Sequence, residues 1–145
     1  MDLSVVIVTY FSRPHITACL HALDRAHGDL SMEVLVVDNA SADGTLDEVR
    51  EKAPWVRIVE TGDNLGYAKA VNRGIRESSG EFVLVLNPDC NVGEDSLRIL
   101  HEWMREHPRC GIAGPQVRNP DGTLEMSGRA FPGPDRKSTR LNSSH

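Results

Sequence analysis

Short apolar runs alternate with helical patterns along most of the chain. Four runs are rich in Val, Ile and Leu and a weaker one follows them: Leu3 to Val8, Glu33 to Val37, Val56 to Val59, Phe82 to Leu86, and Gly111 to Ala113. These runs predict β-strands, and their near-continuous apolar character is typical of strands buried on both faces of a parallel sheet. We therefore expect helices on both faces of the sheet.

The segments between the runs have the apolar spacing of amphipathic helices. Four helices are predicted, marked by Ile16, Leu20, Leu23 and Ala26, by Thr45 to Glu48, by Tyr67 to Ser78, and by Leu97, Leu100 and Met104. The second opens on the S/T-x-x-E spacing of a capping box, and Pro14 suits the first turn of the first helix. The repeated strand–helix order favours an α/β fold with right-handed crossovers.

Beyond Pro115 the pattern changes. Asp121-Gly122, between two short extended segments, predicts a hairpin turn. From Phe131 onward there is no apolar periodicity, and the string from Arg136 to His145 resembles the translation of a vector junction. We therefore predict one domain over residues 1–134 and a disordered or non-native tail over 135–145, the alternative for the tail being a natural flexible segment.

Composition and charge exclude several classes of protein. The chain has 145 residues, 39% of them hydrophobic, which suffices for one domain with a core, and no apolar run reaches the ~18 residues of a membrane span. The net charge of −5 argues against a nucleic-acid partner, because Lys and Arg neutralise nucleic-acid phosphates. Three cysteines without a close pair favour neither a disulfide framework nor a zinc site. No signal peptide is visible, so we expect a cytoplasmic protein.

Polar clusters follow the predicted strands at their carboxyl ends. They are Thr9-Tyr10, Asp38 to Ser41, Asp63 to Gly66, and Asn87 to Asp89. In open α/β sheets, ligands bind outside the carboxyl ends of the strands, where loops and helix N-termini converge. The sequence therefore predicts one ligand site at that edge.

The polar residues have both chemical and structural interpretations. Asp38 ends an apolar strand, so its carboxylate needs hydrogen-bond donors, which can come from a ligand or from its own loop in an Asx turn. Asn64 and Gly66 precede a helix, whose N-terminus favours a phosphate, although Gly66 can equally serve as a turn residue. Asp89 offers the hard oxygen ligand that Mg²⁺ and Mn²⁺ prefer, or it caps a turn.

Taken in order, these stretches resemble the family 2 glycosyltransferases with the GT-A fold, within them the rhamnosyltransferase-like group. The matching stretches are residues 4–10, 36–45, 64–75, 86–89, 114–115 and 119–122. The resemblance implies transfer of a sugar, with inversion, from a nucleoside-diphosphate sugar such as a dTDP- or UDP-sugar. The acceptor implied is a glycan or a lipid-linked sugar.

The resemblance also implies the site residues. Asn87-Pro88-Asp89 corresponds to the family's D-x-D element, which holds Mg²⁺ or Mn²⁺ on the diphosphate; here the first position is an amide, so Asp89 is the expected metal ligand. The residues expected at the nucleotide are Thr9, Tyr10, Asp38, Asn39, Asn64, Gly66, Asn72 and Asn87. Tyr10 could equally be a packing aromatic, and Asn72 a buried amide that ties helix to sheet.

No residue after Asp89 matches the carboxylate that takes the acceptor's proton in this family. We therefore expect the chain to be the donor-binding portion of a longer enzyme, inactive alone, and associated with the membrane only as part of that enzyme. The alternatives are a non-catalytic nucleotide-binding α/β module, such as a receiver-like domain, and a fragment with no ligand. A receiver-like domain would carry acids after the first strand, where this chain has Thr9-Tyr10.

Overall fold

The computed structural model describes residues 1–125, so the predicted tail over 135–145 lies outside the described residues. The chain divides into two compact units, the first over Met1–Ala113 and the second beginning at Gly114. The first unit contains, in chain order, β1 (Leu3–Thr9), α1 (Arg13–Ala26), β2 (Met32–Asp38), α2 (Thr45–Lys52), β3 (Arg57–Glu60), α3 (Tyr67–Glu77), β4 (Phe82–Leu86) and α4 (Ser96–Glu106). The predicted α/β class is confirmed.

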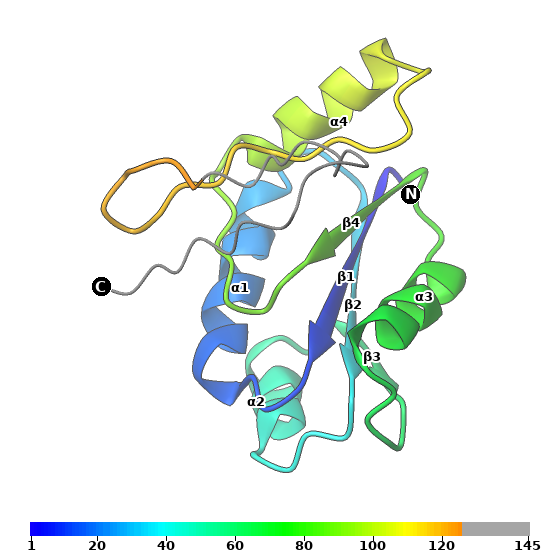
Figure 1. Cartoon of the computed structure of the whole chain (residues 1–145), viewed down its shortest axis with the longest axis vertical. Helices are drawn as coiled ribbons and strands as arrows, with labels where there is room; N and C mark the ends of the chain where they lie inside the picture. The colour runs from blue at the N-terminus through cyan, green and yellow to red at the C-terminus, as the bar shows by residue number, and fades with distance from the viewer. Residues whose placement is uncertain (126–145) are drawn as a thin grey trace, which may run out of the picture. The chain divides into compact units, whose positions relative to one another are not determined.

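The strands form one parallel sheet in the order β3-β2-β1-β4 (Figure 1). In the register of the central pair, Leu3 lies opposite Met32 and Thr9 opposite Asp38. Because all four strands run in the same direction, the segments that follow them leave from one edge of the sheet. The loops that carry the predicted polar clusters therefore begin close together.

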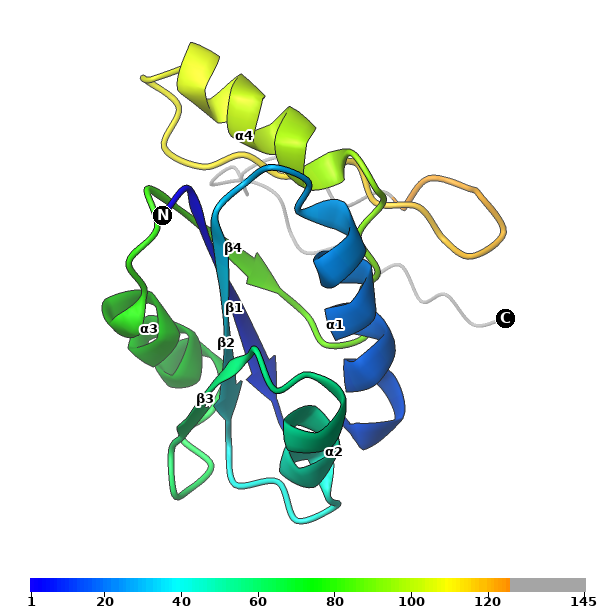
Figure 2. The ribbon, with the colours of Figure 1, turned by 180° about the vertical axis from the view of Figure 1, so that it is seen from behind.

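Helices cover both faces of the sheet, as expected from its apolar strands. Helix α3 lies on one face, and α1 and α2 lie on the other (Figures 1 and 2). The larger core cluster joins Ile7 of β1 with Leu20 of α1 and Leu97 of α4. The smaller one joins Val6 of β1 with Ala70 of α3. Together the two clusters fix α1 and α3 against the central strands, with their N-termini at the edge where those strands end.

Burial on both faces holds for β1 and for most of β2, but the prediction was wrong for the other two strands. Val83 and Val85 of β4 are 38% and 39% exposed, and β3 has exposed residues at both ends. In the sheet formed by residues 1–125 these are the edge strands, and α3 packs on β1 and β2. Apolar composition alone does not distinguish an edge strand from a central one.

Two local predictions were also wrong. Residues Gly111 to Ala113 form no strand, and Ile112 is 92% exposed. Thr45 begins α2, but the residue that caps the helix is Gly44, with a φ of 83°. The Thr45 hydroxyl instead donates to Asp43 Oδ1 at 2.5 Å, because the preceding loop turns Asp43 back over the helix start.

The second unit contains the predicted hairpin turn. Arg118 and Leu124 form an antiparallel bridge on either side of Asp121-Gly122, and the Asn119 amide donates to the Thr123 carbonyl at 2.8 Å. Gly122 has a φ of 85°, which glycine adopts without the steric cost of a side chain. Across residues 1–125, no helix is long and apolar enough to cross a bilayer.

Candidate functional site

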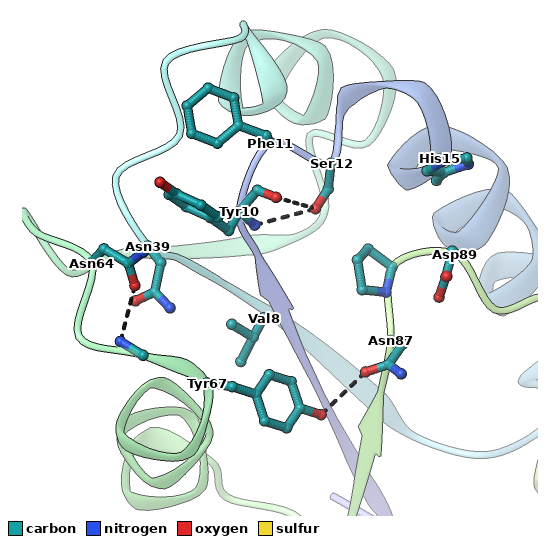
Figure 3. Close-up of a pocket in the computed structure, with 12 residues that line it drawn as sticks. Val8, Tyr10, Phe11, Ser12, His15, Asn39, Asn64, Tyr67, Asn87 and Asp89 are labelled. Atoms are coloured by element: carbon teal, nitrogen blue, oxygen red, sulfur yellow. Dashed lines mark hydrogen bonds between the residues drawn. The ribbon is translucent and has the colours of Figure 1, made fainter. Parts of the chain in front are cut away.

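A pocket of about 540 Å³ lies at the edge of the sheet where the parallel strands end (Figure 3). Its wall comes from the segments after β1, β2 and β4 and from the start of α3. The lining residues are Val8, Tyr10, Phe11, Ser12, His15, Asn39, Asn64, Gly66, Tyr67, Asn87, Pro88 and Asp89. The predicted convergence of strand-end loops on one site is therefore present in the structure.

The loop after β1 places two aromatic rings at the pocket. Phe11 has a φ of 52°, a conformation that costs a residue with a side chain on the order of 1–3 kcal/mol. The loop is held there because the Phe11 amide donates to Ser41 Oγ at 3.0 Å and the Ser12 amide donates to Thr45 Oγ1 at 3.1 Å. The rings of Tyr10 and Phe11 meet edge to face at 4.6 Å and are about half exposed. Exposed aromatic rings of this kind can stack on a planar base.

Asp38 lies beneath this wall and is 2% exposed. Its carboxylate accepts hydrogen bonds from the Thr9 hydroxyl at 2.7 Å, from the Ser41 amide at 2.9 Å and from the Ser41 hydroxyl at 2.6 Å. These donors satisfy the buried charge, as the Asx-turn alternative anticipated. Thr9 is fully buried as well. Both residues therefore support the pocket from below, and neither lines it.

The floor near α3 is organised by two asparagines. Asn39 Oδ1 accepts from the Leu65 amide at 3.4 Å, which ties the loop after β2 to the loop before α3. Asn64 Oδ1 accepts from the Gly66 amide at 3.0 Å. Gly66 caps α3 with a φ of 80°, a conformation that a residue with a side chain adopts only at a steric cost. The N-terminus of α3 therefore reaches the pocket through a loop that needs this glycine.

Among residues 1–125, the one acid that lines the pocket is Asp89, in the loop after β4. Asp89 and Asn87 are both exposed and stand on either side of Pro88. The Asn87 side chain accepts a hydrogen bond from the Tyr67 hydroxyl at 3.2 Å, and its main-chain carbonyl accepts from the Cys90 amide at 3.1 Å (Figure 3). The loop is thereby fixed to α3 on one side and to its own turn on the other.

Cys19 of α1 lies behind this loop. Its Sγ is 3.8 Å from the Asn87 carbonyl oxygen. Burial, with smaller effects from Cys90 and Asp89, raises the pKa of the Cys19 thiol to about 12. Cys19 is therefore a neutral packing group beneath the loop at physiological pH.

The donor set fits a divalent cation of the Mg²⁺ or Mn²⁺ type when phosphate oxygens complete the shell. No group of three or more His, Cys, Asp or Glu side chains within residues 1–125 could hold a metal by itself. Mg²⁺, however, is usually bound by one or two carboxylates together with substrate phosphates and water. Asp89, exposed at the pocket, is the residue that would hold such an ion.

The structure gathers most of the predicted site residues at the pocket, places Thr9 and Asp38 beneath it, and separates Asn72 from it. Six of the nine predicted site residues line the pocket: Tyr10, Asn39, Asn64, Gly66, Asn87 and Asp89. Asn72 does not, because it lies five residues after Tyr67 and so about 140° around the helix from it. Its role at the nucleotide stays a prediction.

Sequence reasoning missed Tyr67, Phe11, Ser12 and His15 as lining residues. Tyr67 had a usable signal, since it is the first residue of a helix whose N-terminus was expected at the ligand. Phe11 and Ser12 directly follow the predicted Thr9-Tyr10 pair. His15 depends on the orientation of α1, which only the packing fixes.

Sequence comparison finds relatives over nearly the whole chain. The family model described as Glycosyl transferase family 2 matches residues 4–144. An N-acetylglucosaminyl-diphospho-decaprenol L-rhamnosyltransferase of Mycobacterium tuberculosis is 39% identical over 90% of this chain and 46% of its own length. The low-salt glycan biosynthesis hexosyltransferase Agl10 of Haloferax volcanii is 32% identical over 83% of this chain and 38% of its own. The chain thus spans less than half the length of these relatives.

Solved structures share the fold. Staphylococcus aureus TarS 1–349, in complex with UDP-GlcNAc, superposes with a TM-score of 0.66 at 31% identity, covering 74% of this chain and 32% of that one. The mannosyltransferase PcManGT of Pyrobaculum calidifontis, in complex with GDP-Man and Mn²⁺, gives 0.64 at 31% identity, covering 71% and 32%. The expected fold is thus confirmed against solved glycosyltransferases.

Proposed function

Because this chain belongs to glycosyl transferase family 2, we propose that its domain over residues 1–134 is the donor-binding portion of an inverting glycosyltransferase. The observation that carries the proposal is the meeting of polar loops from β1, β2 and β4 with the start of α3 around one pocket that contains Asp89. In the whole enzyme this portion would present a nucleoside-diphosphate sugar to an acceptor hydroxyl.

The pocket has two parts, an aromatic part that suits the base of a nucleotide and a polar part that suits its diphosphate. The exposed rings of Tyr10 and Phe11 offer a surface for a base, and the exposed Asn64 offers an amide group beside it, while Asn39 lines the pocket but is only 2% exposed. The α3 N-terminus and the loop of Asn87 and Asp89 form the polar part, which suits a diphosphate. We propose a dTDP- or UDP-sugar as donor; TarS, bound to UDP-GlcNAc, supports a uridine nucleotide.

Asp89 would hold Mg²⁺ or Mn²⁺ on the diphosphate, and the complex of PcManGT with GDP-Man and Mn²⁺ supports this. A cation bound there supplies positive charge to a leaving group that gains negative charge as the sugar bond breaks. The protein's own contribution is to hold Asp89 and the α3 N-terminus in place before the nucleotide binds. Both are fixed by the hydrogen bonds of the loops described above.

For the acceptor we propose a glycan or a lipid-linked sugar. The support is the relative of M. tuberculosis, whose name gives N-acetylglucosaminyl-diphospho-decaprenol. This proposal places the whole enzyme in the cytoplasm, close to a membrane. Without a positioned base the chemical step slows by ~10²- to 10⁴-fold, so the chain alone is expected to bind its donor without measurable transfer.

Calorimetric titration of the chain with UDP and with dTDP, each with Mn²⁺, tests the proposal. Binding is expected in the micromolar to millimolar range, roughly −8 to −4 kcal/mol. Absence of heat with both nucleotides, from protein that circular dichroism shows to be folded, would refute donor binding.

Asp89→Ala should abolish the part of nucleotide binding that depends on Mn²⁺ and leave the thermal midpoint nearly unchanged, because Asp89 is exposed. The matched control is Asp47→Ala, which removes an exposed carboxylate on α2 whose ion pair with Arg50 contributes little. Titration of each variant with and without Mn²⁺ provides the measurement. Equal metal dependence in Asp89→Ala and the parent would exclude Asp89 as the metal ligand.

A further inference from the structure

The Asn87 side chain is held in one orientation from across the pocket. Tyr67, the first residue of α3, donates its hydroxyl hydrogen to Asn87 Oδ1 at 3.2 Å (Figure 3). The main chain of Asn87 is fixed independently, because its carbonyl accepts from the Cys90 amide at 3.1 Å and lies 3.8 Å from Cys19 Sγ. These contacts hold the Asn87 backbone in place and favour one orientation of its side-chain amide.

This orientation separates the two ends of the amide. An asparagine side chain has an acceptor oxygen and a donor NH₂ group. The oxygen faces Tyr67, while Nδ2 points away from it, and within residues 1–125 Nδ2 has no hydrogen-bond partner (Figure 3). Mg²⁺ and Mn²⁺ are bound by oxygen. The hydrogen bond from Tyr67 uses one of the two lone pairs of Asn87 Oδ1 and aligns the amide, and Nδ2 is the end of the side chain left without a partner.

We propose that Tyr67 is a positioning residue that turns the Asn87 amide so that its NH₂ group donates to an oxygen of the nucleoside diphosphate, while the cation is held by Asp89 without Asn87. The inference rests on the proposed donor-binding function and adds a role for Tyr67, which orients the Asn87 amide from across the pocket. The recognised oxygen belongs to a phosphate or to the ribose. A neutral donor at position 87 also avoids the repulsion that a second carboxylate would exert on the diphosphate.

A double-mutant cycle on the whole chain tests the pairing. Tyr67→Phe removes only the hydroxyl, and Asn87→Ala removes the amide. Each is expected to weaken UDP binding about three- to tenfold in the presence of Mn²⁺, the size of one hydrogen bond. The double variant should bind no more weakly than Asn87→Ala alone, because the hydroxyl acts through the amide. If the losses of UDP affinity in Tyr67→Phe and Asn87→Ala added up in the double variant, the proposed action of Tyr67 through Asn87 would be overturned.

The matched control is Tyr10→Phe, which removes another exposed tyrosine hydroxyl at the same pocket. Combined with Asn87→Ala, its effect should add, since within residues 1–125 the Tyr10 hydroxyl forms no bond to Asn87. Tyr67 is 52% exposed, so Tyr67→Phe should keep the thermal midpoint of the parent. Coupling of Tyr10 to Asn87 as strong as that of Tyr67 would overturn the assignment.

The metal arm of the test compares UDP affinity with and without Mn²⁺. Asn87→Ala should weaken both affinities and leave their ratio unchanged, whereas Asp89→Ala should bring the ratio to one. A reduced ratio in Asn87→Ala would make Asn87 a metal ligand and overturn the proposal. Repeating the titration with 2′,3′-dideoxy-UDP separates the two sources of the oxygen: an unchanged Asn87→Ala penalty assigns a phosphate oxygen, and a lost penalty assigns a ribose hydroxyl.

A measurement on the chain without nucleotide tests the contact between Tyr67 and Asn87 separately from the proposal that the chain binds a nucleotide donor. In nitrogen-15 spectra, the side-chain NH₂ signals of Asn87, identified by their loss in Asn87→Ala, should shift in Tyr67→Phe. Unchanged signals would overturn the pairing by themselves. Failure of the parent chain to bind UDP and dTDP would overturn donor binding and this inference together. Binding by the parent with additive penalties would overturn this inference alone.

Discussion

Gly74 is the residue through which α3 approaches the sheet most closely. An added Cβ would lie 3.0 Å from Val37 Cγ2 and would contact Val6 Cγ1 still more closely. Both valines belong to the central strands, where their side chains cannot move without disturbing the core. The absence of a side chain at this position therefore allows α3 to lie close to the sheet, and with it to hold Tyr67 at the pocket.

Gly74→Ala should lower the free energy of unfolding by about 1–3 kcal/mol, the cost of overpacking a core. Urea denaturation followed by circular dichroism provides the measurement. The control is Gly111→Ala, where an added Cβ meets no atom within 4 Å and which should not lower stability. If both alanines had the same small effect, close packing at Gly74 would be excluded.

Glu33 holds the opposite edge of the sheet, where β1 and β4 begin. Its Oε1 accepts from the Ser4 hydroxyl at 2.6 Å, the Ser79 amide at 2.6 Å and the Ser79 hydroxyl at 2.8 Å. Burial by itself would raise the pKa of Glu33, but these hydrogen bonds and the Arg57 charge together lower it below 4.5. The ionised form of Glu33 is therefore favoured in the folded protein.

Stability should consequently depend on pH in the acidic range. A lowered pKa means that the unfolded chain takes up the proton first, so the contribution of Glu33 is complete above pH 4.5 and is lost as pH falls through the lower folded pKa. Urea unfolding of the parent and of Glu33→Gln between pH 3 and roughly pH 6 provides the measurement. The variant should be less stable near pH 6 and lose less stability on acidification; parallel pH profiles would contradict this role.

Within the described residues, β4 is an edge strand with an apolar face. Val83 and Val85 lie opposite Ser4 and Val6 of β1, and their side chains share the face that α3 covers over β1 and β2. An exposed apolar edge strand presents unpaired backbone groups beside a hydrophobic surface, which favours association between chains.

Replacing both valines by threonine should reduce self-association, since threonine keeps the β-branched shape and adds a polar group. Sedimentation velocity over a range of concentrations would measure the change, with the thermal midpoint staying near that of the parent. The matched control is Val5→Thr in the buried part of β1, which should lower stability because its hydroxyl would lack a partner. If the double variant self-associated as strongly as the parent, the β4 face of Val83 and Val85 would be excluded as the site of association.

The pocket is a property of the first unit as a whole, because its wall is formed by segments far apart in the sequence. Residues of the loop after β1 meet residues that follow β4 across the same opening. A ligand that contacts all these segments binds only the folded state and therefore stabilises it.

UDP with Mn²⁺ should accordingly raise the thermal midpoint. At ten times its dissociation constant, the nucleotide adds about 1.4 kcal/mol, which corresponds to a shift of several degrees. Scanning fluorimetry would measure the shift, with inorganic phosphate and Mn²⁺ at the same concentration as the control. An equal shift with phosphate alone would show that the base and ribose contribute nothing to binding.

Most of the fold could be predicted from local pattern. The apolar runs locate β1 to β4, and the helical spacings locate α1 to α4. Both could be predicted because the spacing of apolar residues along the sequence follows the periodicity with which a strand or a helix buries its side chains. The weak run at Gly111 to Ala113 was misread because three apolar or small residues carry no information about a pairing partner. The exposure of Val83 and Val85 was missed for a similar reason, since edge position depends on strand order.

The sequence by itself determined the α/β class, the order of the elements and the strand-end positions of Tyr10, Asn39, Asn87 and Asp89, because these follow from local periodicity and from the direction of parallel strands. Only the tertiary structure decided that Thr9 and Asp38 support the pocket from beneath. It also decided that Tyr67 reaches Asn87, twenty residues away. Such contacts depend on helix rotation and strand order, which no local pattern encodes.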